Sequence, residues 1–188
     1  MRRTKLIFIL IFIIQLAVPL SMIINKEVIL GRGETINFQV RPVDPYDAFR
    51  GKYLRISILE NTVITNTDYF KNNQDVYARI TVDNDGFGTP VAISTEPYDN
   101  ELYIKCKIDN VYDDSVILSF PFDRFYINEK YSSLGEKLYN KYSNGEKKDA
   151  FISVRISKGK AVLEEMYLSG IEINEFIKLE LLKEENEL

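Results

Sequence analysis

The chain opens with a long uncharged stretch. Residues 6–24 contain no charged side chain, and sixteen of the nineteen are apolar. As a helix this stretch would be about 28 Å long, close to the hydrocarbon thickness of a bilayer. The basic residues Arg2, Arg3 and Lys5 precede it. By the positive-inside rule they stay in the cytoplasm, so the sequence predicts a single-pass anchor with the bulk of the chain outside.

A cleaved signal peptide is the alternative reading of this segment. Such peptides have an apolar core of 7–15 residues and a small-residue exit of the Ala-x-Ala kind. Here the apolar core is longer, the nearest Ala is Ala17, and the bulky run Met22-Ile23-Ile24 follows. These two criteria favour an anchor that is not cleaved.

The rest of the chain alternates between apolar and polar residues with a period of two. This period is typical of strands with one buried and one solvated face, as in antiparallel sheets. The turn sequences at 83–86, 144–145 and 158–159 agree with it, and the last should join two strands as a hairpin. The predicted strands are 35–40, 53–59, 76–82, 91–94, 102–108, 116–120, 151–157 and 161–168.

Two further segments have helical patterns. Residues 129–142 form the first, in which Gly135 weakens the helix, and residues 174–187 form an amphipathic tail that Asn174 could cap. The sequence therefore predicts an all-β fold, a mainly antiparallel sandwich or partly open barrel, with a transmembrane helix and one or two short helices. The predicted organisation is an anchor at 1–25, a β-domain at 26–173 and an acidic helical tail at 174–188.

Composition excludes several functions. The chain has no His and one Cys, so it can form no Ser-His-Asp triad, His-ligated zinc or haem site, internal disulfide or Fe–S cluster. Removing the three basic residues of 1–5 from the net charge of −4 leaves −7 for the remainder. An acidic domain argues against nucleic acid as a partner. We expect no cofactor and no metal.

The segment 41–53 is the densest in charge and conformational restriction. Two prolines restrict the backbone of this loop, and Gly51 permits an unusual φ just before a strand. Asp44 and Asp47 lie three residues apart, and Arg50 follows three residues later, so we predict that Arg50 turns inward and pairs with one of them. The interpretation that these pairs only shape the loop is favoured over a catalytic role. The binding or structural motif comprises Asp44, Pro45, Asp47, Arg50, Gly51 and Tyr53.

The stretch 42–58 resembles the signature of the GDYXXLXY family, whose typical run reads Pro-Val-Asp-Pro-Arg-Asp-Leu-Phe-Arg-Gly-Asp-Tyr-x-x-Leu-x-Tyr. Lys52 replaces the Asp before the Tyr, Ile56 the Leu and Ile58 the final Tyr. The resemblance implies a membrane-anchored bacterial protein, linked in some relatives to multi-pass membrane domains, and assigns no reaction. The matching positions are Pro42, Val43, Asp44, Pro45, Asp47, Phe49, Arg50, Gly51 and Tyr53.

Two classes of function remain. The first is a membrane-anchored, extracytoplasmic accessory domain that binds a membrane protein or envelope component. The second is a membrane-bound hydrolase that uses the Asp44, Asp47 and Arg50 cluster, or Ser21 as a signal-peptidase-like nucleophile with Lys105 or Lys107 as base. Of the two, we favour the accessory domain, without catalytic residues.

Three other features of the sequence need an interpretation. The run Asp83-x-Asp85-Gly86 resembles a calcium loop but lacks its Glu, so we interpret it as a hairpin turn. Cys106 has the inward register of its strand, which predicts a buried small hydrophobe. Tyr53, Tyr77 and Tyr103 have the outward register, where aromatic side chains could bind a sugar or a protein partner.

Overall fold

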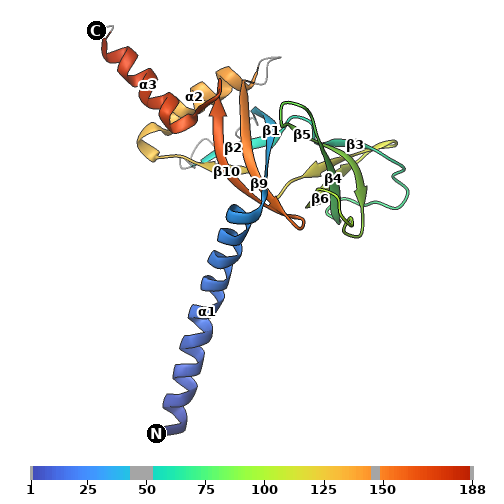
Figure 1. The fold of residues 1–188 in the computed structure, drawn as a ribbon, viewed down its shortest axis with the longest axis vertical. Coiled ribbons are helices and arrows are strands. Elements are labelled where there is room, and N and C mark those ends of the chain that lie inside the picture. The colour runs from blue at the N-terminus through green and yellow to red at the C-terminus, as the bar shows by residue number, and fades with distance from the viewer. Residues whose placement is uncertain (1, 43–52, 145–148, 187–188) are drawn as a thin grey trace.

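The computed structural model describes residues 2–42, 53–144 and 149–186. Its elements form two antiparallel sheets and three α-helices (Figure 1), which confirms the predicted fold class. The helices are α1 (Arg2–Arg32), α2 (Ser132–Ser143) and α3 (Ile173–Asn186), with a 3₁₀ turn, η1 (Glu129–Tyr131), before α2. The strands are β1 (Glu34–Pro42), β2 (Tyr53–Ile58), β3 (Thr62–Ile64), β4 (Asp75–Val82), β5 (Gly88–Ser94), β6 (Tyr103–Val111), β7 (Ser115–Ser119), β8 (Arg124–Tyr126), β9 (Ala150–Ser157), β10 (Lys160–Leu168) and β11 (Ile171–Glu172).

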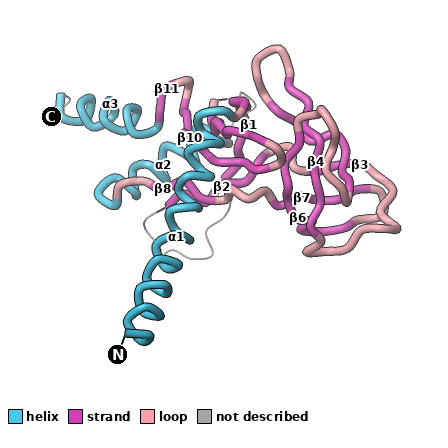
Figure 2. The backbone as a smooth tube through the Cα atoms, turned by 60° about the horizontal axis from the view of Figure 1, so that its bottom comes forward, coloured by secondary structure: helices cyan, strands magenta, loops and turns pink. Residues whose placement is uncertain are grey.

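The first sheet has six strands in the order β11-β10-β9-β1-β2-β8, and the second has five in the order β3-β7-β6-β4-β5. The edge strands β3 and β5 of the second sheet also contact each other, so this sheet curls into a nearly closed barrel. The helices gather at the six-stranded sheet (Figure 2). There α2 packs on β1, β2 and β9, and α3 packs on α2 and β10.

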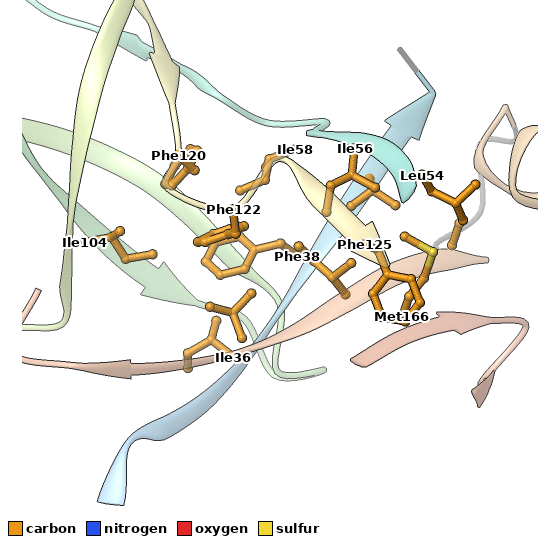
Figure 3. Packing of buried hydrophobic residues seen from close by; sticks show 14 of the residues in the cluster. Ile36, Phe38, Leu54, Ile56, Ile58, Ile104, Phe120, Phe122, Phe125 and Met166 are labelled. Carbon is orange, nitrogen blue, oxygen red and sulfur yellow. The ribbon is translucent and has the colours of Figure 1, made fainter. Parts of the chain in front are cut away.

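The inward residues of both sheets form one apolar core. On β1 the alternation places Ile36, Phe38 and Val40 inside, as the sequence predicts, and the ring of Phe38 contacts those of Phe120 and Phe122 (Figure 3). These rings come from β1 and from the segment between β7 and β8. They therefore join the two sheets at the centre of the domain.

The predicted hairpins are present. β4 and β5 join through the turn at 83–86, and β9 and β10 join through Lys158 and Gly159. The alternation of buried residues weakens at two strand ends. Val82 is the last residue of β4 and is 41% exposed, and Leu102, just before β6, is half-buried against the core. Alternation predicts burial only while the strand stays covered, and these residues lie at its ends.

α1 continues well past the uncharged stretch, as far as Arg32. The segment from Ile7 has the length and apolar composition to cross a membrane, and its most apolar window has none of its residues buried inside the structure. The C-terminal turns of α1 contact β9 and β10, where Ile29 is buried. The amide of Gly33 donates to the carbonyl of Ile29 (2.7 Å), and a guanidinium nitrogen of Arg155 donates to the carbonyl of Gly33 (3.3 Å). The helix is thus tied to the sheet without an intervening linker.

α3 covers one end of the six-stranded sheet. Ile173, Phe176 and Ile177 are buried in the common core, and the Phe176 ring contacts that of Tyr142 on α2. The helix is amphipathic, as its pattern predicts, and it begins at Ile173, one residue before Asn174. The boundary expected between residues 173 and 174 remains a prediction.

Candidate functional site

The motif segment connects β1 to β2 at one end of the six-stranded sheet. Pro42 is the last residue of β1 and Tyr53 is the first of β2. Five predicted site residues, and with them the expected pairing of Arg50, lie outside the described residues: Asp44, Pro45, Asp47, Arg50 and Gly51. Their contacts remain a prediction. The described residues on either side, up to Pro42 and from Tyr53 onward, show what surrounds the two ends of the segment.

Tyr53 lies on the outer face of the sheet beside β8. It pairs across the strands with Tyr126, and the two rings meet edge to face with centroids 5.9 Å apart. The guanidinium carbon of Arg124 lies 5.0 Å from the centre of the Tyr53 ring, within the range of a cation–π contact. Tyr126 is 68% exposed. We call Tyr53, Arg124 and Tyr126 the aromatic edge.

The aromatic edge carries a stable positive charge. Asp123 lies next to Arg124, with 3.6 Å between its carboxylate and the Arg124 Nε. The negative charge of Asp123 raises the pKa of the Arg124 guanidinium further. β8 has only three residues and forms the border of the described sheet. Tyr and Arg are residue types that dominate the binding energy of protein–protein interfaces, and here they lie together at an exposed sheet border.

The other end of the motif is held from inside by α2. The hydroxyl of Tyr139 donates a 2.7 Å hydrogen bond to the backbone carbonyl of Arg41, the residue before Pro42. Tyr139 is buried, and burial raises its pKa, so its hydroxyl keeps the proton that it donates. The contact fixes the end of β1 where the motif begins.

The second half of the motif is structural. Leu54, Ile56 and Ile58 of β2 all point into the core and are buried. Ile56 and Ile58 stand where the family signature has Leu and Tyr, so both replacements fill inward positions. From Tyr53 onward the signature specifies the positions of Tyr53, Ile56 and Ile58. Among them Tyr53 alone lies on the outer face of the sheet.

The signal-peptidase-like arrangement does not assemble among the described residues. The Ser21 hydroxyl lies on α1 and donates to the carbonyl of Val18 in the same helix (2.7 Å). On β6, Lys105 and Lys107 form ion pairs with Asp75 at 3.0 and 2.8 Å. These pairs lower the pKa of Asp75, chiefly through the hydrogen bond from Lys107, and the bond to Asp75 raises the pKa of Lys105. A lysine held in its charged form is a poor general base.

The remaining candidates have structural roles. Cys106 is buried, and desolvation raises the pKa of its thiol to about 12, so it is no nucleophile. The Asp83 carboxylate accepts from the amides of Asp85 (3.0 Å) and Phe87 (2.8 Å), which shapes the predicted hairpin turn. In the described ranges, no three His, Cys, Asp or Glu side chains are grouped as a metal site.

A second tyrosine cluster lies on the outer face of the barrel. The Tyr103 ring lies 5.7 Å from that of Tyr77 and 6.3 Å from that of Tyr98, and the Arg79 guanidinium lies 5.9 Å from the Tyr98 ring. Strand register predicts the outward position of Tyr77 and Tyr103. It misses Tyr98 and Tyr126, because the first lies in a loop and the second in a strand too short to show alternation.

The fold and the motif define a class of protein: a mainly antiparallel β-domain carried on an N-terminal apolar helix, with the motif strand β2 next to the border strand β8 of its sheet. The chain belongs to the GDYXXLXY protein family, whose model matches residues 15–166. That match includes half of α1, the motif and almost the whole of both sheets. No curated protein and no solved structure matches the chain.

Proposed function

We propose that this protein is a membrane-anchored accessory domain that binds a partner outside the cytoplasm through the aromatic edge beside the GDYXXLXY motif. The observation that carries the proposal is the half-buried Tyr53 with the exposed Tyr126 and Arg124 beside it, at the border of a sheet that is tied directly to the anchor helix. The partner is a membrane protein or an envelope component.

The charge pattern around α1 supports the proposed side of the membrane. Three basic residues precede the apolar stretch, and they favour a cytoplasmic N-terminus. The domain then stands outside, joined to the bilayer by a helix whose last turns pack on β9 and β10. A rigid junction of this kind holds the binding surface at a set position above the membrane.

The position of the motif supports contact with a partner beyond the bilayer surface. β1 starts at Glu34, directly after α1, and reaches the motif after nine residues. A strand of that length spans about 30 Å. The aromatic edge therefore lies at the opposite end of β1 from the anchor, where an extramembrane part of a partner could reach it.

Site-specific photo-crosslinking in living cells tests the binding surface. A photoreactive phenylalanine replaces Tyr126 in the full chain, and the matched control replaces Tyr69, which is 80% exposed and lies in the loop after β3. We expect a discrete crosslinked partner from position 126 and none from position 69, and Tyr126→Ala should weaken recovery of the same partner. Equal labelling at both positions would count against the aromatic edge.

Protease protection tests the membrane orientation separately. Protease added to intact spheroplasts should degrade the β-domain while a cytoplasmic control protein survives. If the domain and the control both survive, the domain lies inside and the orientation is wrong. Mass spectrometry of the mature chain shows whether α1 is retained.

A further inference from the structure

The uncharged stretch of α1 contains two hydrogen-bonding side chains, and only one of them is satisfied within the helix. The Ser21 hydroxyl donates to the carbonyl of Val18 at 2.7 Å. The Gln15 amide is exposed on the helix surface and makes no hydrogen bond with any described residue. Gln15 is also the central residue of 6–24. Hydrocarbon offers it no water, so the amide needs a partner.

Pro19 leaves a second group unsatisfied at the same place. In an α-helix the amide of residue 19 bonds to the carbonyl of residue 15, and proline has no amide hydrogen. The backbone carbonyl of Gln15 therefore loses its helical donor. The carbonyl of Gln15 points along the helix toward Pro19, four residues later on the same face. The freed carbonyl and the Gln15 side chain therefore share that face.

We propose that α1 pairs in the membrane with the α1 helix of a second copy of this chain, in parallel, through Gln15. Each copy offers two donors, the amide hydrogens, and two acceptors, the side-chain oxygen and the freed backbone carbonyl. Across a two-fold axis the donors of one copy match the acceptors of the other. Two copies that insert in the same way place their Gln15 side chains at the same depth in the membrane. A helix of another protein would need a polar group at that same depth.

The surface of α1 around Gln15 is open to a second helix. Phe8, Ile11 and Phe12 precede Gln15 by seven, four and three residues, and together with Ile9 they line an open groove beside it. Figure 1 shows α1 projecting clear of the β-domain, and the most apolar window of the helix has no residue buried. This face is therefore accessible to a second helix. The proposal requires insertion of α1 and is independent of the ligand of the aromatic edge.

The full chain in phosphatidylcholine vesicles tests the pairing. Donor and acceptor dyes on the N-terminal amine report association as the lipid-to-protein ratio is varied, and flotation of the vesicles checks insertion of every variant. We expect Gln15→Leu to weaken association by about three- to thirty-fold. Gln15→Asn should restore most of it, and Ser21→Ala, which removes a hydroxyl that is already satisfied, should leave it unchanged.

Two further variants test the geometry. Oxidation should crosslink Ile11→Cys, on the Gln15 face, more readily than Ile13→Cys on the opposite face. Pro19→Ala restores the donor for the Gln15 carbonyl and should weaken pairing by a smaller factor than Gln15→Leu. Association unchanged by Pro19→Ala would overturn the role of that carbonyl.

Three results would overturn the proposal. The first is an inserted wild-type chain that stays monomeric at every ratio. The second is association that Gln15→Leu does not weaken. The third is pairing that appears only after another membrane protein is added, which would make a helix of that protein the occupant of this face.

Discussion

The hydroxyl of Tyr139 reaches across 98 residues of sequence to donate a 2.7 Å hydrogen bond to the backbone carbonyl of Arg41. One residue is on α2 and the other is at the end of β1, directly before the motif. The packing of α2 and the position of the end of β1 are therefore coupled through one buried group. A change inside α2 can shift the residue from which the motif begins.

Tyr139→Phe removes this bond and leaves the ring in place. We expect the free energy of unfolding to fall by about 1 kcal/mol, because the carbonyl of Arg41 loses its partner from α2. Urea unfolding of the full chain in detergent micelles measures the change. Tyr69→Phe is the control, because Tyr69 is 80% exposed. Equal midpoints for Tyr139→Phe and the parent would show that the bond adds nothing to stability.

Gly88→Ala tests the contact between the two sheets. A β-carbon at Gly88 would lie 2.7 Å from Ile36 Cγ2, 2.9 Å from Phe38 Cε1 and 3.0 Å from Ile80 Cγ2. These atoms belong to packed core side chains, so we expect overpacking to cost about 1–3 kcal/mol.

Gly31→Ala is the matched control for Gly88→Ala. It lies in α1 with no atom within 4 Å of an added β-carbon, so it should be neutral or stabilising by up to about 1 kcal/mol. Both variants are compared by urea unfolding of the full chain. A Gly88→Ala variant as stable as Gly31→Ala would mean that β5 can shift away from β1.

The buried thiol of Cys106 predicts a loss of stability at alkaline pH. Its pKa is about 12 in the folded chain and 9.0 in the reference state. The contribution is thus fully present below pH 9, and it is lost as pH rises toward 12, because only the unfolded chain loses its proton there.

Cys106→Ala isolates this effect. Between pH 8 and pH 10.5 the parent should lose about 1–2 kcal/mol more stability than the variant, by linkage. Urea unfolding at the two pH values measures the difference. Parallel losses in parent and variant would assign the alkaline effect to other groups, among them Tyr139.

Arg50→Ala tests the predicted pairing inside the motif. If Arg50 is buried against Asp44 or Asp47, its removal leaves a carboxylate unpaired and should cost about 3–5 kcal/mol. Arg55→Ala is the control, because Arg55 is exposed on β2, and it should change stability by less than about 0.5 kcal/mol. A cost below about 1 kcal/mol for Arg50→Ala would place Arg50 at the surface as a ligand contact.

The local pattern of the sequence was sufficient for the long elements. Alternation identified the inward faces of β1, β2, β6 and β9, because a strand with one covered side records burial at every second residue. It missed β3, β8 and β11, which have three, three and two residues, because so few residues contain no period. Helix α1 extends to Arg32, past the charges at 26 and 27, because its last turns find contacts on β9 and β10 that no local pattern contains.

By itself the sequence determined the apolar N-terminal helix, the antiparallel β class, the family motif and the burial of Cys106, since each depends on the order of neighbouring residues. Only the tertiary structure decided which strands pair, that Tyr126 lies beside Tyr53, and that Tyr139 supports Arg41. Those contacts join residues that are 73 and 98 positions apart. Sheet order and helix packing bring such residues together, and these depend on how all the apolar faces are buried at once.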